Sequence, residues 1–260
     1  MKFLGIDLGW SSGASGLCCL DWQPEKLEVL ALERRLDLSE IWDWIDDWLP
    51  SGRPGMVAVD APTLVPNRTG MRLCDRLAHR YFGRYHAGCY PANQGLAFAA
   101  RTVQFGEQLT QRGFTHAPVL VAQQPGRYQI EVFPHAAMID LFQLEQIIKY
   151  KKGKLSDRRT GLQQLRACML THLPNLKPLI SKLELAEVPT TGAALKAMED
   201  CWDALICAYI AAYWWYWGSD RNWVLGGIDP LTVGQPQPLD PVKVGIFPFL
   251  ATGYIIVPRR

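Results

Sequence analysis

Long apolar runs are missing from this sequence of 260 residues, and their absence narrows the class of protein. The most apolar stretch runs from Ala204 to Trp217 and has fourteen residues, whereas a membrane-spanning helix needs about twenty. The first residues, MKFLGIDLGW, reach an aspartate at position 7 and lack the long apolar segment and cleavage site of a secretory signal. We therefore expect no membrane span, and we interpret the apolar stretch as a buried core helix.

Paired cysteine motifs and a dominant charge are missing as well. The seven cysteines form an odd set without a CxxC pair, which is typical of reduced thiols, so we expect a cytoplasmic protein. The net charge is +2, which neither requires nor excludes a polyanionic partner. Internal repeats and low-complexity tracts are absent from the sequence, and 48% of its residues are hydrophobic. These features indicate a single folded domain over residues 1–260.

A structural zinc site is not expected either. Cys74, His79, His86 and Cys89 are four potential ligands within sixteen residues, but their spacing matches no structural zinc pattern. The surrounding segment is rich in arginine and is predicted to be helical. We therefore do not assign zinc to these residues.

Short apolar runs separated by turn residues predict an α/β domain. KFLGIDLG, ASGLCCLDW and KLEVLALERR predict a three-stranded meander, and LSEIWDWIDDWLP predicts an amphipathic helix capped by Ser39. GMVAVDAP predicts a buried strand that stops at Asp60, and RYQIEVFPHAAMIDLF predicts a strand to Glu131 with a helix opened by Pro134. Residues 63–124 between them predict a mostly helical insertion. Two further helices, the second the longest in the chain, and a final strand GYIIVP complete the pattern.

Acidic residues occur at the ends of these strands and on the last long helix. Asp7 lies in the first strand, Asp60 and Glu131 end later strands, and Asp200 and Asp203 share one face of the helix. Carboxylate oxygens are the ligands that Mg2+ prefers, and like charges held together need a cation. A cluster of these acids would be suited to holding a divalent metal.

Each acid also has a simpler structural explanation. Asp60 can cap a strand end, Glu131 can form an ion pair with Arg127, and Asp200 can be solvated. Asp203 is harder to explain in this way, because a carboxylate on so apolar a helix needs a partner. His135 lies close to the predicted site, where a residue of the helix start is a simpler interpretation than a general base.

Four of these motifs resemble those of a known family. GIDLGW, VAVDAP, IEVFP and EDCWDALICAYIAA resemble, in order, the motifs of the family catalogued as domain of unknown function 429, described as predicted ribonuclease H-fold nucleases. The resemblance implies a ribonuclease H-like mixed five-stranded sheet flanked by helices. The first and last motifs are also similar to those of Holliday junction resolvases, which are two-metal nucleases. That similarity implies a catalytic set of Asp7, Asp60, Glu131 and Asp203. It also implies that these four residues, with Asp200 as an additional candidate, are the ligands of Mg2+ or Mn2+.

Basic residues supply candidate contacts for a nucleic acid. Arginines recur every four residues from Arg68 to Arg84 and would share one helix face, and KYKKGKLSDRR carries six basic residues in eleven positions. A solvated, flexible loop is the alternative for the second stretch. The predicted substrate contacts are Arg72, Arg76, Arg80, Lys152 and Lys154.

The predicted function is metal-dependent hydrolysis of phosphodiester bonds in DNA or RNA. GIDLGW also resembles the first phosphate loop of sugar kinases and actin-like ATPases, in which Gly9 to Gly13 would hold phosphate. Those ATPases need a second Asp-x-Gly loop and a second lobe, whereas Asp60 is followed by Ala61 and Pro62. A non-catalytic nucleic-acid-binding module is the third interpretation, which the occupied acid positions disfavour.

Overall fold

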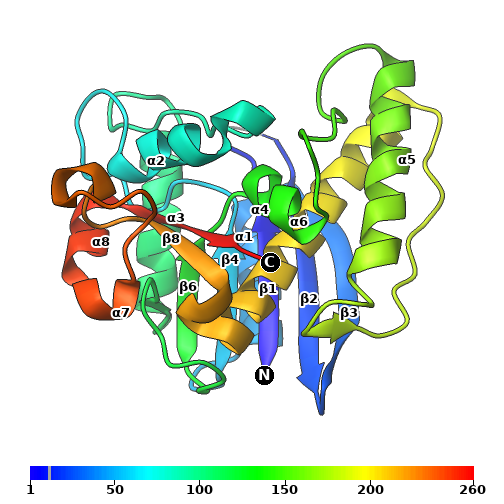
Figure 1. Ribbon diagram of the computed structural model, residues 1–260. Helices are drawn as coiled ribbons and strands as arrows, with labels where there is room; N and C mark the ends of the chain where they lie inside the picture. Colours follow the sequence, from blue (N-terminus) through cyan, green and yellow to red (C-terminus); the bar gives the residue numbers. More distant parts are fainter. Residues whose placement is uncertain (11–12) are drawn as a thin grey trace.

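The computed structural model describes residues 1–10 and 13–260, and a seven-stranded mixed sheet forms its middle layer (Figure 1). The strands are β1 (Lys2–Asp7), β2 (Ser15–Gln23), β3 (Lys26–Arg35), β4 (Gly55–Val59), β5 (Thr115–His116), β6 (Arg127–Glu131) and β7 (Leu179–Ile180). Their order in the sheet is β5-β6-β4-β1-β2-β3-β7. The five longer strands make up the middle of this order, and two-residue strands extend the sheet at both edges.

The pairing confirms the predicted meander and its neighbours. β2 pairs antiparallel with both β1 and β3. β4 pairs parallel with β1, and β6 pairs parallel with β4. The strand before Asp60 therefore lies beside the strand of Asp7, and the strand of Glu131 follows outward, as predicted.

Helices cover both faces of the sheet. They are α1 (Leu38–Trp48), α2 (Leu73–Phe82), α3 (Ala99–Gln111), α4 (Pro134–Leu141), α5 (Leu155–His172), α6 (Gly192–Trp217), α7 (Pro241–Val244) and α8 (Phe247–Thr252). Apolar side chains of α4, α5 and α6 form a core with one face of the sheet, and those of α1 and α3 form a core with the other. The apolar stretch from Ala204 to Trp215 is buried in α6, which confirms its interpretation as a core helix. Among the described residues, no helix is long and apolar enough to span a membrane.

Side-chain alternation in β1 sets the direction of Asp7. Phe3 belongs to the core beneath α6, whereas Leu4 and Ile6 belong to the core beneath α1. Gly5 faces α6, because a Cβ atom there would lie 2.0 Å from the carbonyl oxygen of Ala204. Successive side chains of a strand point to opposite faces, so Asp7 points to the α6 face as well.

Glycine allows α6 to lie directly on the strands. A Cβ atom at Gly16 of β2 would lie 1.8 Å from the carbonyl oxygen of Asp200, just as one at Gly5 would meet the backbone of Ala204 and Ala208. The helix backbone therefore contacts the strand backbone at both points. This close approach brings Asp200 and Asp203 of α6 over the end of β1.

The C-terminal segment forms a small second sheet. β8 (Asn222–Gly226) pairs antiparallel with β9 (Tyr254–Pro258), which confirms the strand predicted for GYIIVP. An isolated parallel bridge between Val132 and Ile256 connects this sheet to the end of β6. Its apolar side chains pack against α2.

Two local predictions were wrong. Ser39 lies inside α1, whose N-cap is Asp37, so it does not cap the helix. The arginine-rich helix α2 begins only at Leu73, with Arg72 as its N-cap, and a 3-10 turn takes over at Gly83. The arginines from Arg68 to Arg84 therefore do not share one helix face.

Candidate functional site

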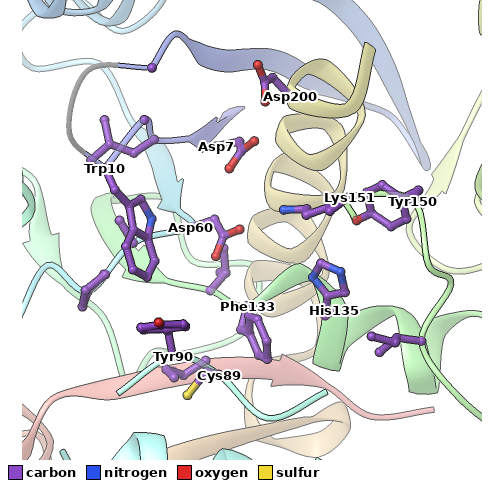
Figure 2. A pocket seen from close by; sticks show the side chains of 18 of the residues that line it. Asp7, Trp10, Asp60, Cys89, Tyr90, Phe133, His135, Tyr150, Lys151 and Asp200 are labelled. Atoms are coloured by element: carbon purple, nitrogen blue, oxygen red, sulfur yellow. The ribbon is translucent and has the colours of Figure 1, made fainter. Parts of the chain in front are cut away.

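A pocket of about 720 Å³ lies at the carboxyl ends of β1, β4 and β6. In α/β folds ligands bind outside the carboxyl ends of parallel strands, because loops there leave side chains free. Carboxylates of Asp7, Asp60 and Asp200, the lysines Lys149, Lys151 and Lys152, and aromatic rings line the pocket. Figure 2 shows the side chains of Asp7 and Asp60 next to each other, with the amine of Lys151 directed toward them.

Three carboxylates come together by strand register and helix packing. Ile6 of β1 pairs with Val59 of β4, so Asp7 and Asp60 are neighbours on adjacent strands, and the Asp60 amide donates to the Ile6 carbonyl at 2.9 Å. Asp203 is fully buried on the face of α6 that covers β1. The register and the packing thus bring Asp7, Asp60 and Asp203 to the same end of the sheet.

The acids interact through their charges. Burial raises the pKa of Asp7 well above its ordinary value, and the charges of Asp203, Asp60 and Asp200 raise it further against the opposing effect of Lys151. Burial likewise raises the pKa of Asp60 to about 7, with Asp203 adding to the shift and Lys151 opposing it. The carboxylates thus repel one another, and added positive charge would stabilise their ionised forms.

Lys151 and Tyr150 are the partners of Asp203. The hydroxyl of Tyr150 donates to Asp203 Oδ1 at 2.6 Å, and Lys151 Nζ lies 2.6 Å from Asp203 Oδ2. Lys151 thus forms a close ion pair with the second oxygen of this carboxylate. Burial would lower the pKa of Lys151, but Asp203, Asp7 and Asp60 together raise it well above its ordinary value. Lys151 is therefore a fixed cation among three acids.

The described residues contain no group of three His, Cys, Asp or Glu side chains arranged to hold a metal ion. Among the cysteines and histidines near α2, His79 already has another partner, since its Nε2 atom lies 2.7 Å from the carbonyl oxygen of Cys89. At the acid cluster, the donor chemistry fits a hard divalent ion, since carboxylates whose pKa values are raised by burial and mutual repulsion favour a cation. In this arrangement the ammonium of Lys151 supplies the positive charge.

Glu131 does not join the three acids. Both of its oxygens accept hydrogen bonds from Arg72, at 2.8 and 2.6 Å, and Arg72 also binds Asp75. Strand register explains the separation, because Val59 pairs with Glu131 and the partner position of Asp60 is Val132. Glu131 thus points to the opposite face of the sheet from Asp60. Burial raises its pKa to about 7 even though Arg72 opposes the shift.

The predicted alternative partner of Glu131 was also wrong. Arg127 donates to backbone carbonyls of Leu49, Pro50, Arg53 and Arg112 and not to Glu131. Its guanidinium lies over the ring of Phe114. Arg127 therefore ties the loop after α1 to the start of β6.

Asp200 is held by cations outside the acid cluster. Arg34 Nε donates to it at 2.8 Å, and Lys196 Nζ lies 2.7 Å from its other oxygen. Lys196 also binds Glu199, which accepts from Arg158. Asp200 is only 2% exposed, which excludes the solvated alternative. Asp200 therefore lines the pocket with its charge already neutralised by Arg34 and Lys196.

The predicted phosphate contacts lie in different surroundings. Arg72 is 3% exposed and committed to Glu131 and Asp75, so the prediction of a free cationic side chain was wrong for it. Arg76 and Arg80 are exposed on α2, where Arg76 borders a shallow second pocket beside Tyr90. Lys152 lines the main pocket, whereas Lys154 is the N-cap of α5.

Tyr150 and Lys151 are the site residues that sequence reasoning did not assign. They lie in the segment between α4 and α5, more than fifty positions before Asp203, so no local pattern links them to it. The signal was indirect: a carboxylate on an apolar helix needs a partner, and a basic stretch was available. The aromatic side chains of Trp10, Tyr90 and Phe133, which also line the pocket, had no signal of this kind.

The fold and site together define an α/β protein with a mixed sheet and a carboxylate pocket at the carboxyl ends of its parallel strands. The family model described as "Protein of unknown function (DUF429)" matches residues 5–222, and the chain belongs to this family. A comparison with curated proteins gave no match.

Proposed function

We propose that this protein is a divalent-metal-dependent nuclease that hydrolyses phosphodiester bonds in nucleic acid. The observation that carries the proposal is the cluster of Asp7, Asp60 and Asp203, three acids whose charges interact with one another and with the ammonium of Lys151 beside the pocket. Such a cluster has a deficit of positive charge. Mg2+ or Mn2+ would remove that deficit, and both ions take oxygen ligands.

The arrangement of elements supports the same class. An antiparallel meander followed by parallel strands, with an acid on the first strand and another on the last long helix, resembles the ribonuclease H-like fold of Holliday junction resolvases. We assign Asp7, Asp60 and Asp203 as the metal ligands. Glu131 is left out of this set because it points to the opposite face of the sheet, and Asp200 because two cations, Arg34 and Lys196, already bind both of its oxygens.

Divalent ions supply this chemistry with an activated water and with stabilisation of the leaving oxygen. The protein's own groups hold and position the reactants. Tyr150 fixes the orientation of Asp203 by its hydrogen bond, and Lys151 holds a positive charge beside the acids. Lys149 and Lys152 line the pocket and are suited to contacts with the phosphates of a bound strand.

Our first prediction tests this proposal with labelled DNA and RNA, single-stranded and duplex, incubated with Mg2+, Mn2+ or a chelator. The wild-type protein should cleave with a metal, and Asp7→Asn should reduce the rate at least about a hundredfold, because the amide weakens metal binding. The variant should stay folded, with an unchanged or higher melting temperature in metal-free buffer, since it removes charge repulsion. Asp43→Asn, an exposed position on α1, is the matched control and should keep full activity.

Absence of cleavage with either metal would reject the nuclease. Hydrolysis of ATP in that case would favour the phosphate-loop alternative at Gly9 to Gly13, a loop whose residues 11 and 12 lie outside the described part of the chain. Binding of nucleic acid without any hydrolysis would favour the non-catalytic module. Unfolding of Asp7→Asn would instead assign Asp7 a structural role.

A further inference from the structure

The pocket has two chemically different ends. Asp7 and Asp60 lie at one end, and Trp10, Tyr90 and Phe133 lie at the other (Figure 2). Carboxylates and lysines serve a charged ligand, but they do not explain why three large aromatic rings border the same space. The aromatic end therefore needs an explanation of its own.

Contacts with Phe98 and hydrogen bonds of the preceding residue, Gly9, fix the position of Trp10. Its ring packs on Phe98 with centroids 4.4 Å apart, and the preceding residue, Gly9, is fixed at both backbone groups. The Gly9 amide donates to the hydroxyl of Ser15 at 3.0 Å, and its carbonyl accepts from Arg101 at 2.9 Å. A ring supported in this way is already ordered in the free protein. Binding of a ligand on this ring would therefore lose little conformational entropy.

Tyr90 is exposed in a way that packing does not require. Its side chain is 70% exposed although it borders the pocket, and its ring meets Trp10 edge-on at 6.2 Å and 85°. Large aromatic residues near a pocket and open to solvent are typical of ligand contacts. The two rings thus form a corner that a flat molecule can occupy.

The other side of the aromatic end is uncharged. Phe133 lies 5.9 Å from His135, whose ring is parallel to that of Tyr150 at 5.5 Å. Burial lowers the pKa of His135 to about 4, with Lys151 adding to the shift, so its ring is neutral at physiological pH. This wall offers aromatic faces and not a second cation.

We propose that the aromatic end of the pocket binds one unpaired nucleobase and places the phosphate beside it over Asp7 and Asp60. The volume of about 720 Å³ lies within the range of small-molecule pockets, which suits a single unpaired nucleotide. Stacking on aromatic rings contributes about 1–3 kcal/mol per base and tolerates every base. This inference rests on the proposed function and specifies its substrate as single-stranded or locally unpaired nucleic acid of mixed sequence.

The test measures binding separately from cleavage. Fluorescence anisotropy of a labelled 12-nucleotide single strand and of its duplex is recorded with Ca2+ in place of Mg2+, for the wild type and four variants. Tyr90→Ala and Trp10→Leu should each weaken single-strand binding about tenfold, as loss of one stacking partner predicts. Tyr90→Phe should keep wild-type affinity because it keeps the ring. Phe247→Ala, which removes an aromatic side chain 81% exposed and remote from the pocket, is the matched control and should have no effect.

Several outcomes would overturn the base site. Equal loss of single-strand and duplex affinity in Tyr90→Ala would assign Tyr90 a structural role, and unchanged affinity in both ring variants would remove the aromatic end from the binding site. Cleavage of duplex and single strand at equal rates, insensitive to Tyr90, would leave the nuclease intact and reject the inference.

A further measurement, the binding of nucleoside monophosphates to the wild type and to Tyr90→Ala, separates the two proposals. Tyr90-dependent binding of nucleoside monophosphates, with neither strand binding nor cleavage, would retain a base pocket and reject nucleic acid as its source. Tyr90-dependent binding of the single strand, stronger than that of the mononucleotide, supports the proposal as stated.

Discussion

Arg72 is a buried guanidinium whose charge is matched by two carboxylates. It donates to Glu131 at 2.8 and 2.6 Å, to Asp75 at 2.8 Å and to the carbonyl of Leu64 at 2.9 Å. Asp75 in turn accepts from the amides of Arg72 and Ala92. Removing one member of such a network leaves a buried charge without a partner, which costs far more than loss of a surface ion pair.

The second prediction follows from this network. Arg72→Met should lower the free energy of unfolding by about 3–5 kcal/mol, because Glu131 and Asp75 would then face each other without a cation. Arg76→Met, one turn further along α2 and exposed, should change it by less than about 0.5 kcal/mol. Urea unfolding followed by circular dichroism measures both. If both variants had similarly small effects, the charge of Arg72 would not be needed to stabilise Glu131 and Asp75.

The third prediction concerns the pH dependence of Asp60. Its pKa is about 7 in the folded protein, whereas an aspartate in an unfolded chain titrates near 4. Between these values the folded state holds a proton that the unfolded state has lost, so the free energy of unfolding falls as pH rises from about 4 to about 7. The unfavourable contribution is complete above pH 7.

Asp60→Asn removes this contribution and should therefore be more stable than the wild type by about 1–2 kcal/mol at pH 8 in a chelator, with little difference at pH 4. Urea titrations at both pH values measure the difference. Asp43→Asn, exposed on α1, should show no pH-dependent difference. A wild type that is the more stable protein at pH 8 would contradict the assigned direction of the pKa shift.

At the scale of elements, the packing of α6 on β1 and β2 decides where Asp203 lies. The helix backbone contacts the strands at Gly5 and Gly16, and each contact depends on the absence of a Cβ atom. Helix and strand backbones that touch leave no room for adjustment by side-chain rotation. The site therefore depends on two glycines that carry no chemistry.

The fourth prediction is that Gly16→Ala destabilises the protein by about 3 kcal/mol or more, since its Cβ atom would lie 1.8 Å from the Asp200 carbonyl oxygen. Gly83→Ala is the matched control. Gly83 is exposed, has a φ of -58° and would meet no atom within 4 Å, so this variant should be neutral or slightly more stable. Thermal unfolding of both variants provides the measurement. A Gly16→Ala protein with wild-type stability would show that α6 does not lie against β2 as described.

The longer strands and several helices could be predicted from the sequence, because each depends on a local pattern of apolar residues, whereas the two-residue edge strands β5 and β7 could not. The meander, the strand beside it and the helix opened by Pro134 all formed where expected. The place of Glu131 depended on register instead. Asp60 lies one residue beyond the end of β4, while Glu131 is the last residue of β6 and pairs with Val59. A shift of one residue reverses the face, and a single sequence does not specify it.

The partners of the acids were beyond local patterns for a different reason. Tyr150 and Lys151 belong to an irregular segment whose path depends on how α4 and α5 pack. Burial of Asp203 on an apolar helix required some partner, and the sequence alone left several basic residues equally suited. The folded structure shows that Lys151 is the basic residue that pairs with Asp203.

At the scale of the whole molecule, the pocket lies where three kinds of segment meet. The parallel strands end at its floor, α6 crosses above β1, and the segment that carries Lys151 closes one side (Figure 2). Asp7, Asp60 and Asp203 would carry three negative charges if all were ionised, against one from Lys151. A divalent ion and Lys151 thus compete for the same carboxylates.

The last prediction follows from this competition. Lys151→Met removes the fixed cation, so the metal-free protein should lose up to about 3 kcal/mol of unfolding free energy, because the fully buried Asp203 loses its charged partner while Lys151 itself is 30% exposed. Without the lysine ammonium, the acids should bind a divalent ion more tightly. Mn2+ should therefore raise the melting temperature of Lys151→Met more than that of the wild type, with a midpoint at lower metal concentration. Lys152→Met is the matched control, because Lys152 lines the same pocket but is exposed, and its response to Mn2+ should equal that of the wild type.

Thermal shift titrations with Mn2+ and Mg2+ need no assumption about the substrate, so they test the metal site independently of cleavage. If Mn2+ stabilises the wild type and the Lys151→Met protein loses that response, Lys151 supports the metal and does not compete with it. If neither protein responds to either ion while both remain folded, the three acids hold Lys151 as a purely structural cation. A larger response confined to Lys151→Met shows that the lysine occupies the position of the ion, and it places metal binding under the control of the segment between α4 and α5.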